Sequence, residues 1–174
     1  MIESLLGDAE TIAAAGSVHP GESVTDSLAR AAWTVIAEPG DAVAGALIEA
    51  LGAEDALSVA IGDSGALLPP GGGSGTTSRA LAEGRARWRP RASPGAVRDA
   101  LRGAADIGAR LLIPGDEYWP VALGDLGPHA PVALWVRGRG ELLRREPRDW
   151  YVAVFVLARL RFRERVDRVV DHAV

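Results

Sequence analysis

The sequence predicts a fold of mixed class, α+β to α/β, in which a small helical module precedes the start of an α/β domain. Two observations support this prediction. Up to residue 62, three short segments with apolar residues at helical spacing follow one another, and a glycine closes each of them. After residue 93, one capped helix is followed by three apolar segments of strand length, at residues 111–113, 131–136 and 151–157. The 174 residues suffice for one ordinary domain or two small ones.

Residues 1–25 are expected to form an acidic, loosely ordered extension. Its apolar residues between positions 2 and 13 could line one face of a short helix. His19-Pro20-Gly21 would end such a helix, because proline blocks helix interiors and glycine favours turns. We therefore expect this segment to lie outside the core.

Residues 26–62 are expected to form the helical module. A helix over residues 27–37 ends at Glu38-Pro39-Gly40, and Asp41 is placed to accept N–H bonds at the start of the next helix. Gly52 ends that second helix, and a third helix covers residues 54–61. Three short helices joined by turns that contain glycine resemble helix-hairpin-helix or SAM-like domains.

Residues 63–92 are rich in Pro, Gly and Arg and are expected to form a flexible linker, because such a tract has little apolar surface to bury. Its glycine run does not fit a phosphate-binding loop, since no strand precedes it and no Gly-Lys-Ser/Thr follows it. Residues 93–174 are expected to begin the α/β domain. There, Ser93 and Pro94 mark the start of a helix that Gly108 ends, and an amphipathic helix is expected over residues 162–173.

Composition and charge exclude several kinds of site. There is no cysteine, which excludes disulfides and thiolate sites, and His19, His129 and His172 are too scattered for a spaced metal motif. We expect no metal, no cofactor and no enzyme activity. There is no basic n-region at the start and no apolar run near the roughly 18 residues that span a bilayer, so a soluble cytoplasmic protein without a membrane partner is expected.

The charge is uneven along the chain, although the net charge is only -4. Residues 1–63 hold eleven acids and one base, whereas residues 79–110 hold eight arginines against three acids. Residues 137–171 hold ten arginines against six acids. The later part is therefore expected to be electropositive and to attract a polyanion. The alternative is that these arginines are solvated surface charges in a chain without lysine.

A long motif joins the first two predicted strands. It consists of a Gly-Asp turn, an aromatic-Pro pair, a leucine three residues on, and a proline-initiated strand with an aromatic residue and a closing glycine. These residues are Gly115, Asp116, Trp119, Pro120, Leu123, Pro131, Leu134, Trp135 and Gly138. The pattern resembles the entry into the Rossmann-like domain of the DNA-processing protein A family, also called DprA or Smf. The resemblance covers roughly residues 28–154, apart from the linker, and the helical module resembles the N-terminal domain of actinobacterial members.

The resemblance implies a role in DNA uptake, natural transformation and recombination. Family members bind single-stranded DNA, help to load the RecA recombinase onto it, and form homodimers through the Rossmann-like domain. Their Gly-Ser/Ala-Arg turn and following Tyr-Gly are missing after residue 151 of this sequence. We therefore expect a truncated or frame-disrupted member with an incomplete Rossmann-like domain, which could lose the dimer. A genuine short paralogue is the alternative.

The candidate DNA contacts are arginines that follow the motif, namely Arg137, Arg139, Arg144, Arg145 and Arg148. Arginine contacts to phosphates weaken steeply with salt. Within the motif, Trp119 and Trp135 are expected to fill a core or an interdomain contact, and Asp116 is expected to stabilise a turn. Two other functions stay open: a remnant without catalytic function, and a Rossmann-like nucleotide-binding enzyme. The enzyme is disfavoured because no phosphate loop, paired carboxylates or nucleophile–base arrangement is visible.

Overall fold

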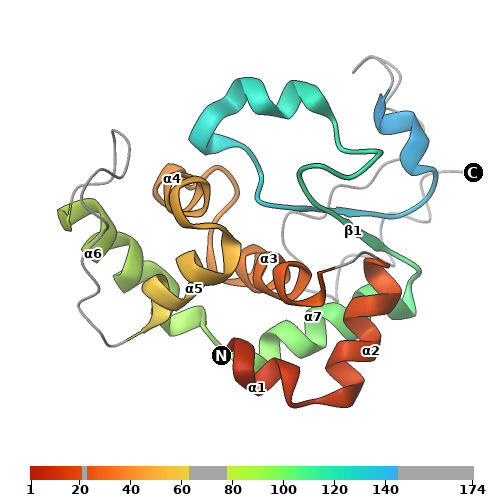
Figure 1. The fold of residues 1–174 in the computed structure, drawn as a ribbon, viewed down its shortest axis with the longest axis horizontal. Helices are drawn as coiled ribbons and strands as arrows, with labels where there is room; N and C mark the ends of the chain where they lie inside the picture. Colours follow the sequence, from red (N-terminus) through yellow and green to blue (C-terminus); the bar gives the residue numbers. More distant parts are fainter. Residues whose placement is uncertain (21–22, 63–77, 145–174) are drawn as a thin grey trace, which may run out of the picture.

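The computed structural model describes residues 1–20, 23–62 and 78–144, and this part of the chain is mostly helical (Figure 1). The helices are α1 (Ile2–Leu6), α2 (Ala9–Val18), α3 (Val24–Ile36), α4 (Ala42–Leu51), α5 (Ala53–Ile61), α6 (Ser78–Trp88) and α7 (Pro94–Asp106). Three short 3-10 helices are η1 (Arg89–Arg91), η2 (Val121–His129) and η3 (Gly140–Arg144). The strands β1 (Arg110–Leu112) and β2 (Leu134–Val136) form the small sheet of the described part. The class is α+β.

Helix α3 lies at the centre of the helical core and contacts α1, α2, α5 and α7. Ser23 caps it, because its Oγ accepts a hydrogen bond from the Asp26 backbone N–H at 3.2 Å. Trp33 and Ile36 are fully buried. Three alanines of the same helix are fully buried as well, and their small side chains let neighbouring helices approach on several faces. The helix predicted over residues 27–37 is thus present and begins one turn earlier.

The two remaining helices of the predicted module begin and end close to their expected positions. Asp41 caps α4, and its Oδ1 accepts from the backbone N–H groups of Val43 at 3.1 Å and Ala44 at 3.2 Å. Gly52 ends α4 and directly precedes α5, with a φ of 81° that side chains rarely tolerate. The local signals for caps and stops therefore predict this part of the fold correctly.

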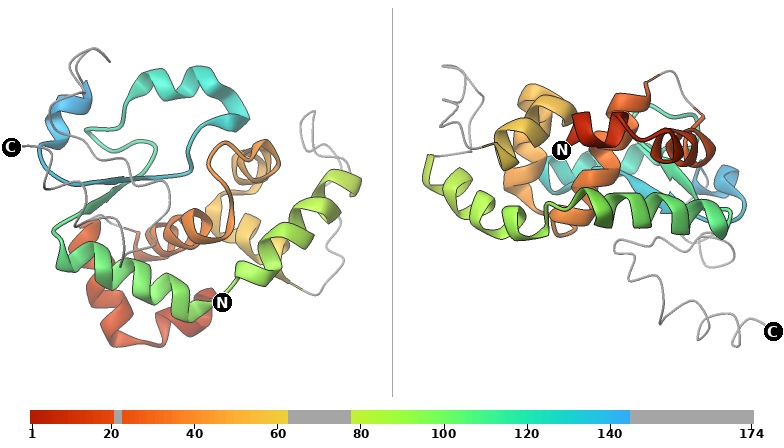
Figure 2. Two further views of the ribbon diagram at one scale, coloured as in Figure 1. Left: turned by 180° about the vertical axis from the view of Figure 1, so that it is seen from behind. Right: turned by 90° about the horizontal axis from the view of Figure 1, so that it is seen from below.

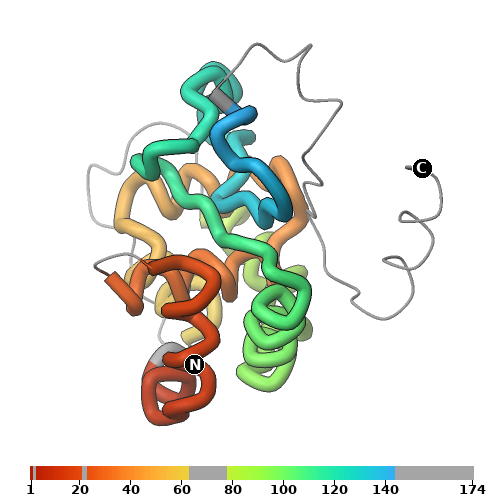
Figure 3. Tube along the Cα trace, turned by 90° about the vertical axis from the view of Figure 1, so that its right-hand side faces the viewer, coloured from red at the N-terminus to blue at the C-terminus, as the bar shows by residue number. Residues whose placement is uncertain are grey.

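The first eighteen residues differ from the loosely ordered extension expected for residues 1–25. They form α1 and α2, and Leu5, Ala15 and Val18 are 0–1% exposed. Helix α2 lies along α7 (Figure 3). The expectation was wrong because the apolar face of α2 is narrow and α7, which covers it, comes some eighty residues later in the chain.

The segment expected as a linker over residues 63–92 also contains a part of the core. Its described portion forms α6 and η1, which extend toward α7 along one side of the molecule (Figure 2). Trp88 is 1% exposed and meets Trp33 edge to face, with ring centroids 5.2 Å apart. A Cβ on Gly84 would lie 2.6 Å from the Trp88 ring, so only glycine leaves room for it. Residues 63–77 lie outside the described part.

Strands β1 and β2 pair antiparallel, with Arg110 opposite Val136, Leu111 opposite Trp135 and Leu112 opposite Leu134. The pairing differs from the start of an α/β sheet, because η2 and extended chain join the two strands and no crossover helix does. Strand β1 has the predicted length and begins one residue earlier, whereas β2 is shorter than the predicted 131–136. The third strand expected at residues 151–157 and the helix expected at 162–173 lie outside the described residues.

Candidate nucleic-acid interface

The Gly-Asp turn of the motif follows β1 directly. Gly115 has a φ of 100°, which favours glycine, and the Asp116 Oδ2 accepts from the Ile113 backbone N–H at 2.8 Å. The expectation that Asp116 stabilises a turn is thus confirmed. Gly138, which closes the motif after β2, has a φ of 104° and turns the chain into η3.

We call the two-stranded antiparallel sheet of β1 and β2 the ribbon. The other motif residues pack the ribbon against the helices. Trp135 is 2% exposed, and its Nε1 donates to the Thr34 Oγ1 of α3 at 3.1 Å, which confirms its expected place in the core. Trp119 is half-buried. It packs, together with Leu123, against a small cluster formed by Leu112, Leu134, Val136 and Leu143. Pro120 is buried, and Pro131 is half-buried at the start of the segment that leads into β2.

Three further contacts fix the ribbon and η2 to the helical body. Arg30 of α3 donates to the Val132 carbonyl oxygen at 2.9 Å. The His129 Nδ1 lies 2.9 Å from the Gly40 carbonyl oxygen. Gly45 of α4 lies so close to η2 that a Cβ there would be 1.9 Å from the Pro128 carbonyl oxygen. The helices and the ribbon of the described part therefore form one packed unit.

The arginines predicted as DNA contacts fall near the end of the ribbon. Arg137 and Arg139 are exposed, and the Arg139 Nε donates to the Glu141 Oε1 at 2.9 Å. Arg144 is the last residue of η3. Arg145 and Arg148 lie outside the described residues, so the structure brings together only part of the predicted set.

Arg110 belongs to this surface and was missed by the sequence analysis. It is exposed, and its Cα pairs with that of Val136, the residue before Arg137, so the two arginines lie near the same end of the ribbon. Successive side chains of a strand point to opposite faces, so Arg110, which is opposite Val136, and Arg137 extend from different faces of the ribbon. In the described part of the chain, neither Arg110 nor Arg137 has an acidic partner. Only knowledge of the strand register could have revealed Arg110, because 27 positions separate it from Arg137. We call Arg110, Arg137 and Arg139 the ribbon-end arginines.

The arginine-rich segment of residues 79–110 is largely matched by acids of the N-terminal half. Ion pairs between the two segments join Arg87 to Asp41 at 3.0 Å, Arg91 to Glu38 at 2.6 Å, Arg98 to Asp8 at 3.4 Å, and Arg102 to Glu10. Arg85 and Arg89 donate to carbonyl oxygens at the end of α5, where cations are favoured. Within the described residues, most of the positive charge of residues 79–110 is thus paired, and the exposed arginines without an acidic partner there, Arg110 and Arg137, lie at the ribbon end.

Two aspartates have a lowered pKa as part of this pairing. Burial of Asp41 acts to raise its pKa, but hydrogen bonds from Arg87, from the Trp88 Nε1 at 3.0 Å and from the α4 backbone outweigh burial and lower it. The pKa of Asp8 is lowered first by the hydrogen bond from the Thr11 hydroxyl, with Arg98 contributing. Both carboxylates therefore favour the folded state in their charged form.

A second group of polar side chains meets where α2, α3 and the Gly-Asp turn come together. The Ser27 Oγ lies 2.7 Å from the His19 Nδ1, and both Asp116 carboxylate oxygens lie 3.2 Å from the His19 Nε2. Sequence reasoning missed this group, because His19 and Asp116 are 97 positions apart. Ser27 is 2% exposed and its hydroxyl lies 3.0 Å from the Ser23 carbonyl oxygen. A buried hydroxyl in this position has no access to a substrate, so the group is not arranged for nucleophilic catalysis.

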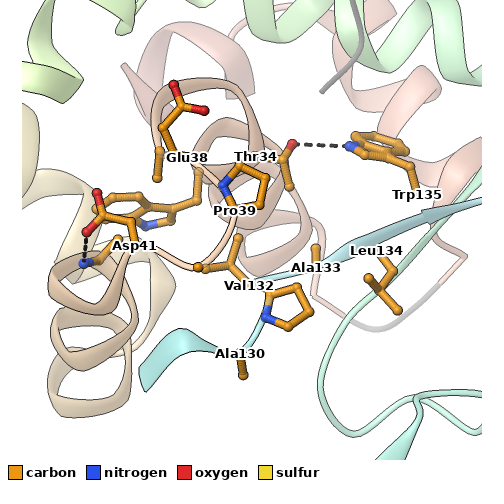
Figure 4. A pocket seen from close by; sticks show the side chains of 14 residues that line it. Thr34, Glu38, Pro39, Asp41, Ala130, Val132, Ala133, Leu134 and Trp135 are labelled. Atoms are coloured by element: carbon orange, nitrogen blue, oxygen red, sulfur yellow. Dashed lines mark hydrogen bonds between the residues drawn. The ribbon is translucent and has the colours of Figure 1, made fainter. Parts of the chain in front are cut away.

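A small cavity lies between the α3–α4 connection and residues 130–135 (Figure 4). Its volume is about 50 Å³, and its walls include Trp33, Pro39 and Val132. Pockets that hold small-molecule ligands have volumes of about 300–1,000 Å³, so this cavity is too small for a nucleotide.

Comparison of the chain with protein-family models, with curated proteins and with solved structures gives no significant match. In the ranges that the structure describes, no helix combines the length and the apolar character needed to cross a membrane. The candidate interface therefore depends on the geometry of the chain itself and on the motif that runs through it.

Proposed function

We propose that this protein is a DNA-processing accessory protein of the DprA kind, which binds single-stranded DNA through the ribbon-end arginines and acts with the RecA recombinase in DNA uptake and recombination. The observation that carries the proposal is that the exposed Arg110 and Arg137 lie near the same end of the ribbon. Arg110 is the first residue of β1 and Arg137 follows β2 directly, so they lie where the chain enters and leaves the motif that resembles the family. The activity is binding, and no bond is broken.

The chemistry of the ribbon end fits phosphate groups. A guanidinium group offers a planar fork of donors that matches two phosphate oxygens. The same side chains on α6 and α7 are mostly paired with acids or carbonyl oxygens, so they are less available. Glu141 competes with a phosphate for Arg139, which makes Arg110 and Arg137 the stronger contacts of the three.

Fluorescence anisotropy with a labelled oligo-dT of about 20 nucleotides, measured over a series of salt concentrations, tests this proposal. For single strands, each neutralised phosphate contributes roughly 0.7 to the slope of log affinity against log salt. The double variant R110Q/R137Q is therefore expected to bind more weakly and to have a slope smaller by about 1.4. Arg79→Gln is the matched control, since Arg79 is exposed on α6 and pairs only with Glu83 among the described residues.

Two results would contradict the proposal. The first is no binding by the full chain at low salt. The second is equal loss of affinity in the double variant and in a variant with two arginines of α7 replaced, R98Q/R102Q, because it would show that only total charge matters. Retention of RecA on the immobilised protein, with and without the oligonucleotide, tests the proposed partner separately.

A further inference from the structure

An aromatic side chain lies next to one of the ribbon-end arginines. Tyr118 follows the Gly-Asp turn after β1, and its side chain faces Gly140, the first residue of η3. A Cβ on Gly140 would lie 3.4 Å from the Tyr118 Cδ2 and 3.8 Å from its Cβ and Cγ, so the tyrosine lies close against this stretch of backbone. Gly140 directly follows Arg139, and consecutive Cα atoms are about 3.8 Å apart. The tyrosine ring is thus a neighbour of an exposed arginine of the proposed interface.

The Tyr118 side chain is only half-buried. One part of it packs on the same small apolar cluster as Trp119. In the part of the chain that the structure describes, the Tyr118 hydroxyl makes no hydrogen bond, and no buried polar side-chain atom lacks a partner. The hydroxyl therefore reaches solvent, and the outer end of the ring is accessible next to Arg139.

An accessible aromatic ring beside arginines suits a single strand of nucleic acid. Proteins that bind single strands combine a positively charged surface, which follows the backbone, with aromatic side chains on which bases stack. A base and its phosphate are joined through one sugar, so neighbouring protein groups can contact both at once. Arginines alone do not separate a single strand from a duplex, because both carry phosphates.

We propose that Tyr118 is a specificity-determining residue of the ribbon end, and that its ring stacks on a base of the single strand whose phosphates the arginines bind. This inference rests on the proposed function and goes beyond it, because it assigns the preference for single strands to one side chain. The bases of a duplex are stacked on one another, so a duplex offers no free base to the ring. Every base has a face that can stack, so no sequence preference is expected.

An abasic oligomer separates stacking from phosphate binding. The oligo-dT of the salt titration and a chain of the same number of abasic deoxyribose phosphate units carry the same charge, but only the first has bases. Stacking of one base on an aromatic side chain corresponds to about 5- to 150-fold in affinity. The full chain is expected to bind oligo-dT more tightly than the abasic oligomer, by a factor near the lower end of this range because Tyr118 is half-buried.

Two substitutions assign this preference to the ring. Tyr118→Leu keeps an apolar side chain on the cluster but has no ring, so it is expected to bind both oligomers as weakly as the unchanged chain binds the abasic one. Tyr118→Phe is the matched control, because it removes only a hydroxyl that makes no hydrogen bond within the described residues, and it is expected to keep the preference. If Tyr118→Leu does not fold, oligo-dT that carries one iodouracil is irradiated with the unchanged chain, and the crosslinked peptide is expected to contain Tyr118.

The outcomes distinguish this inference from the proposed function. If the full chain binds neither oligomer at low salt, the proposed function fails and the inference fails with it. If it binds both oligomers equally, or if Tyr118→Leu keeps the preference for oligo-dT, phosphate binding stands and the role of Tyr118 is overturned. A crosslink to a peptide without Tyr118 overturns it as well. The double variant R110Q/R137Q is expected to weaken the binding of both oligomers by the same factor, because it leaves the ring in place.

Discussion

Replacement of Asp41 by alanine is expected to be among the most damaging changes to a single polar side chain of this protein. Its Oδ1 caps α4, and its Oδ2 accepts from the indole Nε1 of Trp88 and from Arg87, both at 3.0 Å. The Asp41 side chain is only 7% exposed and Trp88 is 1% exposed. The carboxylate thus joins α4 to α6 at a place where water cannot take over both sets of bonds.

The magnitude follows from the two kinds of bond. Loss of an N-cap costs about 1 kcal/mol, and a buried indole N–H left without an acceptor costs about 1–3 kcal/mol. The free energy of unfolding of Asp41→Ala is therefore expected to fall by about 2–4 kcal/mol, which lowers the unfolding midpoint by about 4–16 °C. The ion pair with Arg87 adds little, because the arginine side chain is 47% exposed.

Urea unfolding followed by tryptophan fluorescence measures this loss, because Trp88 and Trp33 are in contact in the core. Asn is as good an N-cap as Asp, so Asp41→Asn is expected to retain the cap and to lose the acceptor that Oδ2 provides for Trp88 and Arg87. Glu83→Gln is the control, since it removes an exposed i,i+4 pair worth less than about 0.5 kcal/mol. If Asp41→Ala loses no more stability than Glu83→Gln, the role assigned to the buried carboxylate is refuted.

Three further outcomes are expected. The pKa of Asp41 is lowered in the folded state, so its charged carboxylate stabilises the fold above the unfolded pKa of about 3.9. This stabilisation is lost as the pH falls through the folded pKa, so acid unfolding should be steeper in the unchanged chain than in Asp41→Asn. Gly45→Ala places a Cβ 1.9 Å from the Pro128 carbonyl oxygen and should displace η2, which faster hydrogen exchange over residues 121–130 would reveal. Gly84→Ala crowds the Trp88 ring at 2.6 Å and should cost about 1–3 kcal/mol in urea unfolding, with an altered near-ultraviolet circular dichroism signal.

The parts of the fold that could be predicted are those set by neighbours in sequence. Asp41 and Ser93 cap helices by bonding to backbone groups two or three residues away, and Gly52 ends a helix through its own φ. Trp88 could not be placed in the core from sequence, because its surroundings depend on Trp33, 55 positions earlier, and on the gap left by Gly84. Local patterns carry no information about contacts of that kind.

The same limit applies to the candidate interface. The motif predicted that the strands and the Gly-Asp turn would stand in order along the chain, and they do. It did not predict that the strands would pair antiparallel and bring Arg110 and Arg137 to the same end of the ribbon. The acids of residues 1–63 and the arginines of residues 79–110 were both visible in the sequence. The sequence analysis interpreted the arginines as part of a surface for polyanions and did not consider that the acids would pair with them.

Acidic residues of the N-terminal half form ion pairs with arginines of α6, η1 and α7, and this pairing affects how the chain folds. During synthesis the first 63 residues appear with eleven acids and one base, so they repel one another until the arginines that follow have been made. Helix α2 makes its most extensive contacts with α7, so these contacts span more than half of the described chain. Refolding is therefore expected to slow as the ionic strength rises, because salt screens the attraction that brings the late segment onto the early one. We therefore expect α2 to reach its full stability only after the arginine-rich segment that contains α7 has been synthesised.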